Sequence, residues 1–195
     1  MHGLTNRAIQ RFVTDSYGAS KWVECAQKAD LGFIDFESML VYPDEMTHDI
    51  LDAASIVLGR PRVDLMEDIG TYLVSHTNTE ALRRLLRFGG VTFVEFLHSL
   101  DDLPGRTHLA VPDLDMPQIE LRDHSDSQFS LVCKSPVEGF GNVMMGILRA
   151  MADDYGVLAL LEHTGGGQGI ETISINLVVT EFSEGRSFEL GARVG

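Results

Sequence analysis

The hydrophobic period of this chain changes once, close to Pro112, and the change limits the folds that are open to it. Before Pro112, apolar residues recur every three to four positions, which is the spacing of an amphipathic helix. After it, apolar and polar residues alternate, as in a strand with one buried face. The pattern predicts an α+β fold, in which a helical N-terminal subdomain is followed by an antiparallel sheet with one crossing helix.

Cap and turn residues mark the ends of the expected helices. A helix from Leu4 to Tyr17 ends at Gly18, and Ser20 is expected to cap the next helix. Pro43 suits the start of a third helix that runs to Gly59. Three more helices are expected over residues 63–74, from a cap at Asn78 to Gly89, and over residues 91–103, where Pro104 and Gly105 end the last one.

In the second half, strands are expected around residues 119–121 and 129–133, followed by a helix over about 141–155. Two further strands are expected over residues 157–162 and 170–182, and a Gly-rich tip at 164–167 joins them. A short strand at about 187–190 is expected near the end of the sequence.

The length of 195 residues suits one well-buried core rather than two. We therefore expect a single domain over residues 1–195, with a helical subdomain at about 1–103 and an α/β subdomain at about 104–195. The joint between them, near residues 104–117, is where a ligand cleft is expected, because ligands favour such boundaries.

The chain is acidic, with 15 Lys and Arg against 29 Asp and Glu and a net charge of −14. It offers no excess of basic residues to neutralise phosphates, which argues against binding nucleic acid or an anionic membrane. No apolar run approaches the roughly 20 residues of a membrane span, and no signal peptide is expected in the first residues, whose apolar pattern is interrupted by charge and amides. Two cysteines are too few for a disulfide framework. A cytoplasmic protein is expected.

Several short motifs follow one another over roughly residues 1–182. They are Met1-His2-Gly3 with Asn6, Tyr17-Gly18 before Trp22, Thr47 to Leu51, Gly70, Phe96 to Leu103, Pro112, Pro117, and Gly146 with Ile147. Their order and spacing resemble the H-NOX (haem nitric-oxide/oxygen binding, HNOB) family, which includes the sensor domain of soluble guanylate cyclase and bacterial gas sensors. The resemblance implies an H-NOX-like fold, a haem cofactor and signalling in response to a diatomic gas such as nitric oxide.

The resemblance places the family's axial haem histidine at position 104, where this chain has Pro104. Proline has no side-chain donor for iron. The family's propionate-binding Tyr-x-Ser-x-Arg run corresponds to residues 133–137, where Cys133 and Val137 replace its ends and Ser135 is retained. Loss of the arginine removes a bidentate partner for an anion. These changes argue against the family's usual haem ligation, and no protein metal ligand is expected apart from the candidate His108.

Further pocket positions follow from the same resemblance. Pro117 takes the place of a proline that presses on the porphyrin, and Thr5 of the first helix is also expected to contact the cofactor. Val143 takes the place of the distal tyrosine of oxygen-binding members, so a haem here would favour nitric oxide and carbon monoxide over oxygen. His108 is the candidate replacement ligand, with His98 and a Cys133 thiolate as other options. A solvated surface histidine is the alternative interpretation of His108.

Two functions remain open at this point. One is a haem-based gas sensor with altered ligation. The other is a haem-free protein-interaction module, or a binder of another apolar or tetrapyrrole-like ligand in the old haem pocket. No Ser-His-Asp or Cys-His arrangement is apparent, so the chain is not expected to be an enzyme. The resemblance implies a signalling effector as partner, such as a histidine kinase or a cyclic-dinucleotide enzyme.

Overall fold

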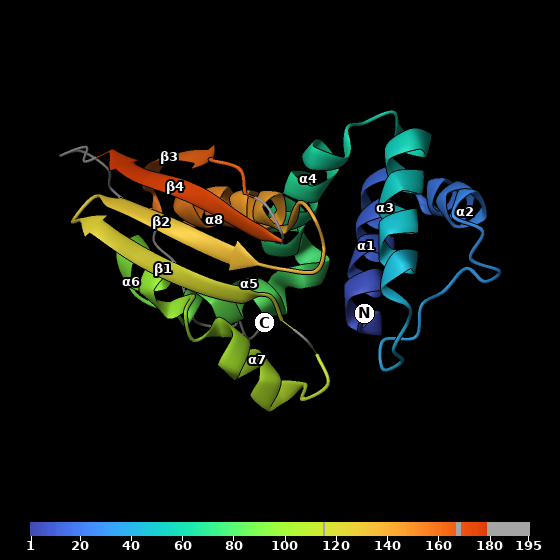
Figure 1. Cartoon of the computed structure of the whole chain (residues 1–195), viewed down its shortest axis with the longest axis horizontal. Coiled ribbons are helices and arrows are strands. Elements are labelled where there is room, and N and C mark those ends of the chain that lie inside the picture. Colours follow the sequence, from blue (N-terminus) through green and yellow to red (C-terminus); the bar gives the residue numbers. More distant parts are fainter. Residues whose placement is uncertain (115, 167–168, 179–195) are drawn as a thin grey trace, which may run out of the picture.

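The structure, a computed structural model, describes residues 1–114, 116–166 and 169–178. Its first part is helical: α1 (Gly3–Tyr17), α2 (Ala19–Lys28), α3 (Asp44–Leu58), α4 (Arg62–Ser75), the 3-10 turn η1 (Thr77–Thr79), α5 (Glu80–Arg87), α6 (Phe93–Ser99) and α7 (Leu103–Ala110). The second part contains β1 (Gln118–Ser125), β2 (Gln128–Lys134), α8 (Phe140–Tyr155), β3 (Leu158–His163) and β4 (Ile170–Val178). Figure 1 shows α1 to α3 grouped on one side and the sheet, with α8 against it, on the other.

The four strands form one antiparallel sheet in the order β1-β2-β4-β3. In the register of β2 and β4, Leu131 pairs with Ile173 and Phe129 with Ile175. All four side chains are buried, because this face of the sheet lies against α8. The α+β fold expected from the change of period, with its crossing helix, is confirmed.

Helix α8 lies at the centre of the molecule. Every residue from Gly141 to Leu148 is buried. One side of α8 contacts the sheet, and α4 packs along another. The same cluster of buried apolar residues includes Phe12 of α1 and Leu131 of β2, so the helical half and the sheet half share one core.

Two helix caps differ from the prediction. Helix α2 starts directly after Gly18, which has a φ of 94° and connects it to α1, so Ser20 lies inside the helix and does not cap it. Thr79 rather than Asn78 precedes α5. Asn78 lies in η1, and its Nδ2 donates a hydrogen bond to Asp15 instead. In both places a tertiary or connecting constraint outweighs local capping preference.

The helix expected over residues 91–103 is wrong, because the chain forms two shorter helices there. Helix α6 ends at Ser99, and α7 begins at Leu103. Pro104 and Gly105 do not end a helix but lie in the first turn of α7. A proline is tolerated there because the amide hydrogen that it lacks would have no acceptor within the helix.

Three expectations lie outside the described residues: the strand beyond Val178, the strand at about 187–190, and Gly167 of the Gly-rich tip. Within the described ranges, none of the helices has both the length and the apolar composition that crossing a membrane requires.

Candidate functional site

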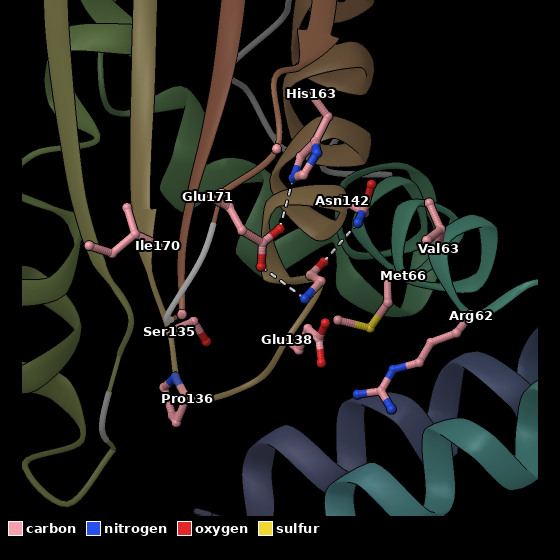
Figure 2. Close-up of a pocket in the computed structure, with 14 residues that line it drawn as sticks. Arg62, Val63, Met66, Ser135, Pro136, Glu138, Asn142, His163, Ile170 and Glu171 are labelled. Atoms are coloured by element: carbon pink, nitrogen blue, oxygen red, sulfur yellow. Dashed lines mark hydrogen bonds and ion pairs between the residues drawn. The ribbon is translucent and has the colours of Figure 1, made fainter.

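A cavity of about 650 Å³ lies between three parts of the chain, as Figure 2 shows. Its walls come from the start of α4, from the loop between β2 and α8 with the first turn of α8, and from the described residues at and between the ends of β3 and β4. This volume falls within the range of roughly 300–1,000 Å³ that is usual for small-molecule pockets. Its non-glycine lining residues are Arg62, Val63, Met66, Ser135, Pro136, Glu138, Asn142, His163, Ile170 and Glu171.

Glu171 organises the polar wall of this cavity. Its Oε1 accepts a hydrogen bond from the amide of Gly139 at 2.8 Å, and its Oε2 accepts one from the amide of Gly141 at 3.0 Å. Oε2 also lies 2.8 Å from Nε2 of His163 (Figure 2). Gly139 directly precedes α8 and Gly141 lies in its first turn, where amide hydrogens without helical acceptors favour a negative charge. The Glu171 carboxylate is therefore an internal anion bound at the N-terminus of α8.

Side chains of β4 point alternately to the two faces of the sheet, and this alternation directs Glu171 toward the start of α8. Glu171 has the same parity as Ile173 and Ile175, which are buried against α8, so its side chain also points inward. Gly141 provides the space, because a Cβ at this position would lie 2.6 Å from Oε2 of Glu171 and 2.7 Å from Nε2 of His163. A charged residue at an inward position of an alternating strand is a signal in the sequence that the sequence analysis missed.

The charges around the cavity are mainly negative. Arg62 donates a hydrogen bond to Oδ1 of Asp52 at 2.8 Å, and its Nη2 lies 2.9 Å from Nδ1 of His48. Its positive charge is thus already matched by a carboxylate of α3. Glu138 makes no hydrogen bond or ion pair with the described part of the chain. Two lining carboxylates and one paired guanidinium make the cavity unfavourable for a ligand with several negative charges. Neither Arg62 nor Glu138 was singled out from the sequence.

Ser135 lines the cavity, as expected for a site residue, whereas Cys133 and Val137 of the same run do not. Its side chain is buried, and its Oγ accepts a hydrogen bond from the amide of Val137 at 3.0 Å. Val137 is buried and apolar. Cys133 lies on β2 opposite Glu171, and burial, with a smaller effect of that carboxylate, raises the pKa of its thiol to about 12. The thiol is therefore protonated at neutral pH, which argues against a Cys133 thiolate as an iron ligand.

The other residues singled out from the sequence lie elsewhere and do not line this cavity. Pro104 is half-buried in α7, and His108 is exposed four residues later in the same helix. Residues at this spacing share one face of a helix. Val143 is buried in α8, Thr5 is half-buried in α1, and Pro117 is half-buried just before β1. Among the described residues, no group of three or more His, Cys, Asp or Glu side chains is arranged to hold a metal ion.

Comparison with known proteins gives a match to one family model. Residues 2–162 match the model described as "Haem-NO-binding" (HNOB). Among curated proteins, the chain is 23% identical over 155 residues to soluble guanylate cyclase 89Da of Drosophila melanogaster, covering 80% of this chain and 23% of that protein. It is 26% identical over 154 residues to soluble guanylate cyclase gcy-31 of Caenorhabditis elegans, covering 79% of this chain and 22% of that protein. The chain thus spans less than a quarter of the length of these relatives.

Solved structures with the same fold include H-NOX proteins from two organisms. An Fe(II) unliganded H-NOX protein from K. algicida superimposes with a TM-score of 0.78 at 14% identity, covering 93% of this chain and 99% of that one. An H-NOX protein from S. oneidensis in the Fe(II)NO state gives a TM-score of 0.73 at 19% identity, covering 92% of this chain and 100% of that one. At such low identities these matches establish the fold alone.

Proposed function

The chain belongs to the haem-NO-binding family, and from this premise we propose that it is a sensory signalling domain that works without an iron–histidine bond from position 104. The observation that carries the proposal is Pro104 itself. By resemblance it occupies the axial position, and a proline offers iron no donor atom. Because this bond cannot form from position 104, a signal that is triggered by straining or breaking it cannot arise in this chain.

The residues that would surround a haem of the family type do not fit the cofactor well. Val137 stands where the arginine for the propionates is implied, and the Cys133 thiol is protonated. At the start of α8, the amides of Gly139 and Gly141 already bind the Glu171 carboxylate. A propionate near Ser135 would meet the carboxylates of Glu171 and Glu138. The cation of the same cavity, Arg62, is already paired with Asp52. These observations favour a domain that responds to something other than a histidine-ligated haem.

A second candidate function keeps the haem but changes its ligand. His108 lies one helical turn after Pro104, on the same face of α7, and its exposed imidazole is not engaged in a hydrogen bond or ion pair with the described residues. In this version the domain is a gas sensor with altered ligation. The apolar Val143 would then give bound oxygen no hydrogen-bond donor.

The organisation and partners of the domain are part of the proposal. We assign residues 1–195 to one domain, with a helical subdomain over about 1–103 and an α/β subdomain over about 104–195. The similarity to soluble guanylate cyclases supports a role in signalling to an effector. A histidine kinase or a cyclic-dinucleotide enzyme is the kind of effector that the family implies.

A visible spectrum of the purified chain tests the proposal. We expect no Soret band, and no saturable one-to-one complex when the chain is titrated with haemin. A stoichiometric haem whose Soret band shifts with nitric oxide would contradict the proposal. If that band is lost in His108→Ala but kept in His124→Ala, a matched change of an exposed histidine on β1, the second candidate replaces the first.

A further inference from the structure

Three consecutive large apolar residues project from the loop between α2 and α3. Met39, Leu40 and Val41 are 75%, 54% and 72% exposed, respectively. Met39 and Leu40 lie in a turn over residues 37–40, in which the amide of Leu40 donates a hydrogen bond to the carbonyl of Glu37, and Val41 follows it. Turn tips are normally occupied by small or polar residues, so a Met-Leu-Val run at such a place is unusual. We call these three residues the apolar ridge.

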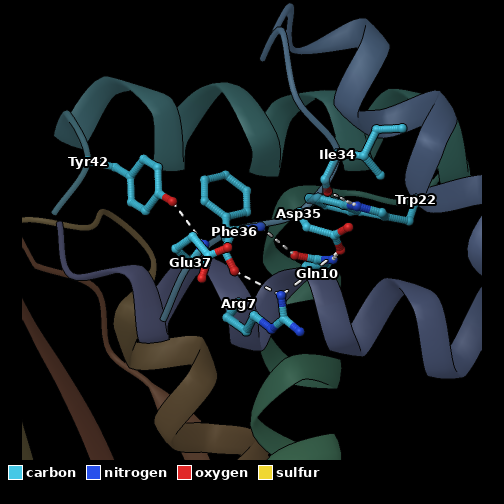
Figure 3. Close-up of polar contacts among 8 residues, drawn as sticks. All are labelled: Arg7, Gln10, Trp22, Ile34, Asp35, Phe36, Glu37 and Tyr42. Atoms are coloured by element: carbon cyan, nitrogen blue, oxygen red, sulfur yellow. Dashed lines mark hydrogen bonds and ion pairs between the residues drawn. The ribbon is translucent and has the colours of Figure 1, made fainter. Parts of the chain in front are cut away.

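Hydrogen bonds hold the loop before the ridge firmly on α1, as Figure 3 shows. Gln10 accepts a hydrogen bond from the amide of Phe36 at 3.0 Å, and Arg7 donates one to the carbonyl of Phe36 at 2.8 Å. Trp22 fixes the start of the loop by donating to the carbonyl of Ile34 at 2.7 Å. The hydroxyl of Tyr42 accepts from the amide of Glu37 at 2.9 Å. The backbone that leads into the ridge is therefore held in place by several hydrogen bonds.

Gly3 allows the ridge to lie against the start of α1. The amide of Gly3 donates a hydrogen bond to the carbonyl of Leu40 at 2.7 Å. A Cβ at Gly3 would lie 2.1 Å from the carbonyl oxygen of Glu37 and 2.9 Å from that of Leu40. Because these are backbone atoms, a larger residue would displace the turn. A close backbone contact at Gly3 thus holds the turn against α1, while the apolar side chains of the ridge stay exposed to water.

The surroundings of the ridge are acidic. Residues 30–49 contain six Asp and Glu and no Lys or Arg. Within the described chain, the exposed carboxylates of Glu37 and Glu45 are not engaged in any ion pair. Asp35 is approached by Arg7 only at 4.0 Å. A surface with an apolar centre and a negative rim is complementary to one with an apolar centre and a positive rim.

We propose that the apolar ridge is a docking surface for a partner protein that offers an amphipathic helix with Lys and Arg residues beside its apolar stripe. The rows of side chains on such a helix leave grooves into which Met39 and Val41 fit, and methionine adapts easily to an apolar contact. A rigid ridge loses little conformational entropy on binding. Its small size matches a transient signalling contact of micromolar affinity. The proposal does not depend on the presence or absence of haem.

Charge argues against two other occupants. A second copy of this chain would bring the same carboxylates to the interface, at a net charge of −14 per chain. An anionic lipid surface would be repelled in the same way. The partner chemistry that the ridge and its rim favour is therefore basic and apolar together.

The test uses a labelled 18-residue helical peptide that has Leu at the apolar positions and Lys at all others. Fluorescence anisotropy with the whole chain should show saturable binding that weakens with added salt. Met39→Ser combined with Val41→Ser should weaken it at least tenfold. The control is Phe88→Ser combined with Val91→Ser, which removes two apolar side chains of similar exposure elsewhere and should leave the affinity within twofold. Glu37→Gln combined with Glu45→Gln should weaken binding and reduce its salt dependence.

Amide chemical-shift mapping with the same peptide should locate the largest changes at residues 36–42. The proposal is overturned if the two apolar double variants bind alike, or if a peptide with Glu in place of Lys binds as well as the Lys peptide. It is also overturned if sedimentation shows a dimer of this chain that the ridge variant dissociates, because the occupant would then be a second copy.

Discussion

Gly70 of α4 and Gly146 of α8 each face the backbone of the opposite helix. A Cβ at Gly70 would lie 1.9 Å from the carbonyl oxygen of Val143, and one at Gly146 would lie 2.0 Å from that of Glu67. The two helices thus touch backbone to backbone, and neither contact can relax by moving a flexible side chain. Any side chain at either position has to push the helices apart.

Alanine at either glycine should therefore be costly. We expect Gly70→Ala and Gly146→Ala each to lower the free energy of unfolding by about 3 kcal/mol, the upper part of the range for overpacked cores. Gly105→Ala is the control, because no atom of the described residues lies within 4 Å of the Cβ position of this exposed glycine of α7. That change should raise stability by about 0.5–1 kcal/mol through helix propensity. Urea unfolding measures all three, and equal effects would show that the close contact is absent.

Glu171 should be important for the stability of α8. Glu171→Gln keeps the size of the side chain but leaves one acceptor oxygen for the amides of Gly139 and Gly141. We expect a loss of about 1.5 kcal/mol in urea unfolding, together with faster hydrogen exchange at these two amides. Glu138→Gln, a neutralisation of an exposed carboxylate in the same cavity, should change stability by less than about 0.5 kcal/mol. Identical results for the two variants would rule out the anchoring role of Glu171.

The hydrogen bond from Tyr72 to Asp15 should make stability depend on pH. The Tyr72 hydroxyl donates to Oδ2 of Asp15 at 2.6 Å, and this bond, with a second from Asn78, lowers the pKa of the Asp15 carboxyl. The charged form stabilises the fold above the unfolded pKa of about 3.9, and this contribution is lost as the pH falls through the lower folded value. Tyr72→Phe should therefore cost about 1 kcal/mol at pH 7 and progressively less below about pH 4.

A matched hydroxyl deletion separates this effect from a general one. The Tyr42 hydroxyl accepts from the amide of Glu37 and, among the residues that the structure describes, bonds no carboxylate. Tyr42→Phe should thus reduce stability by an amount that is the same at pH 7 and at low pH. If the cost of Tyr72→Phe is equally flat with pH in denaturant unfolding, the link to Asp15 is wrong.

A histidine at position 104 should improve haem binding. Pro104→His supplies the imidazole that the family resemblance implies there, and leaving the first turn of α7 without proline costs little. We expect this variant to form a saturable one-to-one complex with haemin, which the unaltered chain is not expected to form, with a Soret band that responds to nitric oxide. Gly105→His presents the same group about 100° around the helix and should gain much less. Equal gains in the two variants, measured by haemin titration, would contradict the axial assignment of position 104.

Sequence reasoning predicted the fold class well because local signals and tertiary structure agree over most of the chain. Pro43 does precede α3, and Gly59 does end it. In β1 and β2 the apolar residues of the alternating pattern point to the buried face of the sheet, as expected. The prediction from sequence failed where one residue type is compatible with two local structures. Proline is compatible with both the end of one helix and the first turn of the next, and at Pro104 the turn before α7 decided between them.

The candidate site was harder to predict, because its members come from distant segments. Ser135 was identified through a family motif, whereas Arg62 carries no local signal and reaches the cavity only through the packing of α4. Glu171 could have been found, since its inward parity in β4 predicts a buried carboxylate that needs donors. Its donors, the first amides of α8, become apparent only when β4 is placed beside that helix.

The strand order described above also has a consequence for how the chain reaches its native state. Strands β1 and β2 are joined by a tight turn, and only residues 164–169 separate β3 from β4 in the sequence, so each pair can form locally. The pairing of β2 with β4, in contrast, brings Lys134 beside Ile170, and the whole of α8 and β3 lies between these two residues in the sequence. Of the three strand pairings in the sheet, forming this one costs the most loop-closure entropy. We therefore expect two early hairpins and a slower step in which they merge over α8.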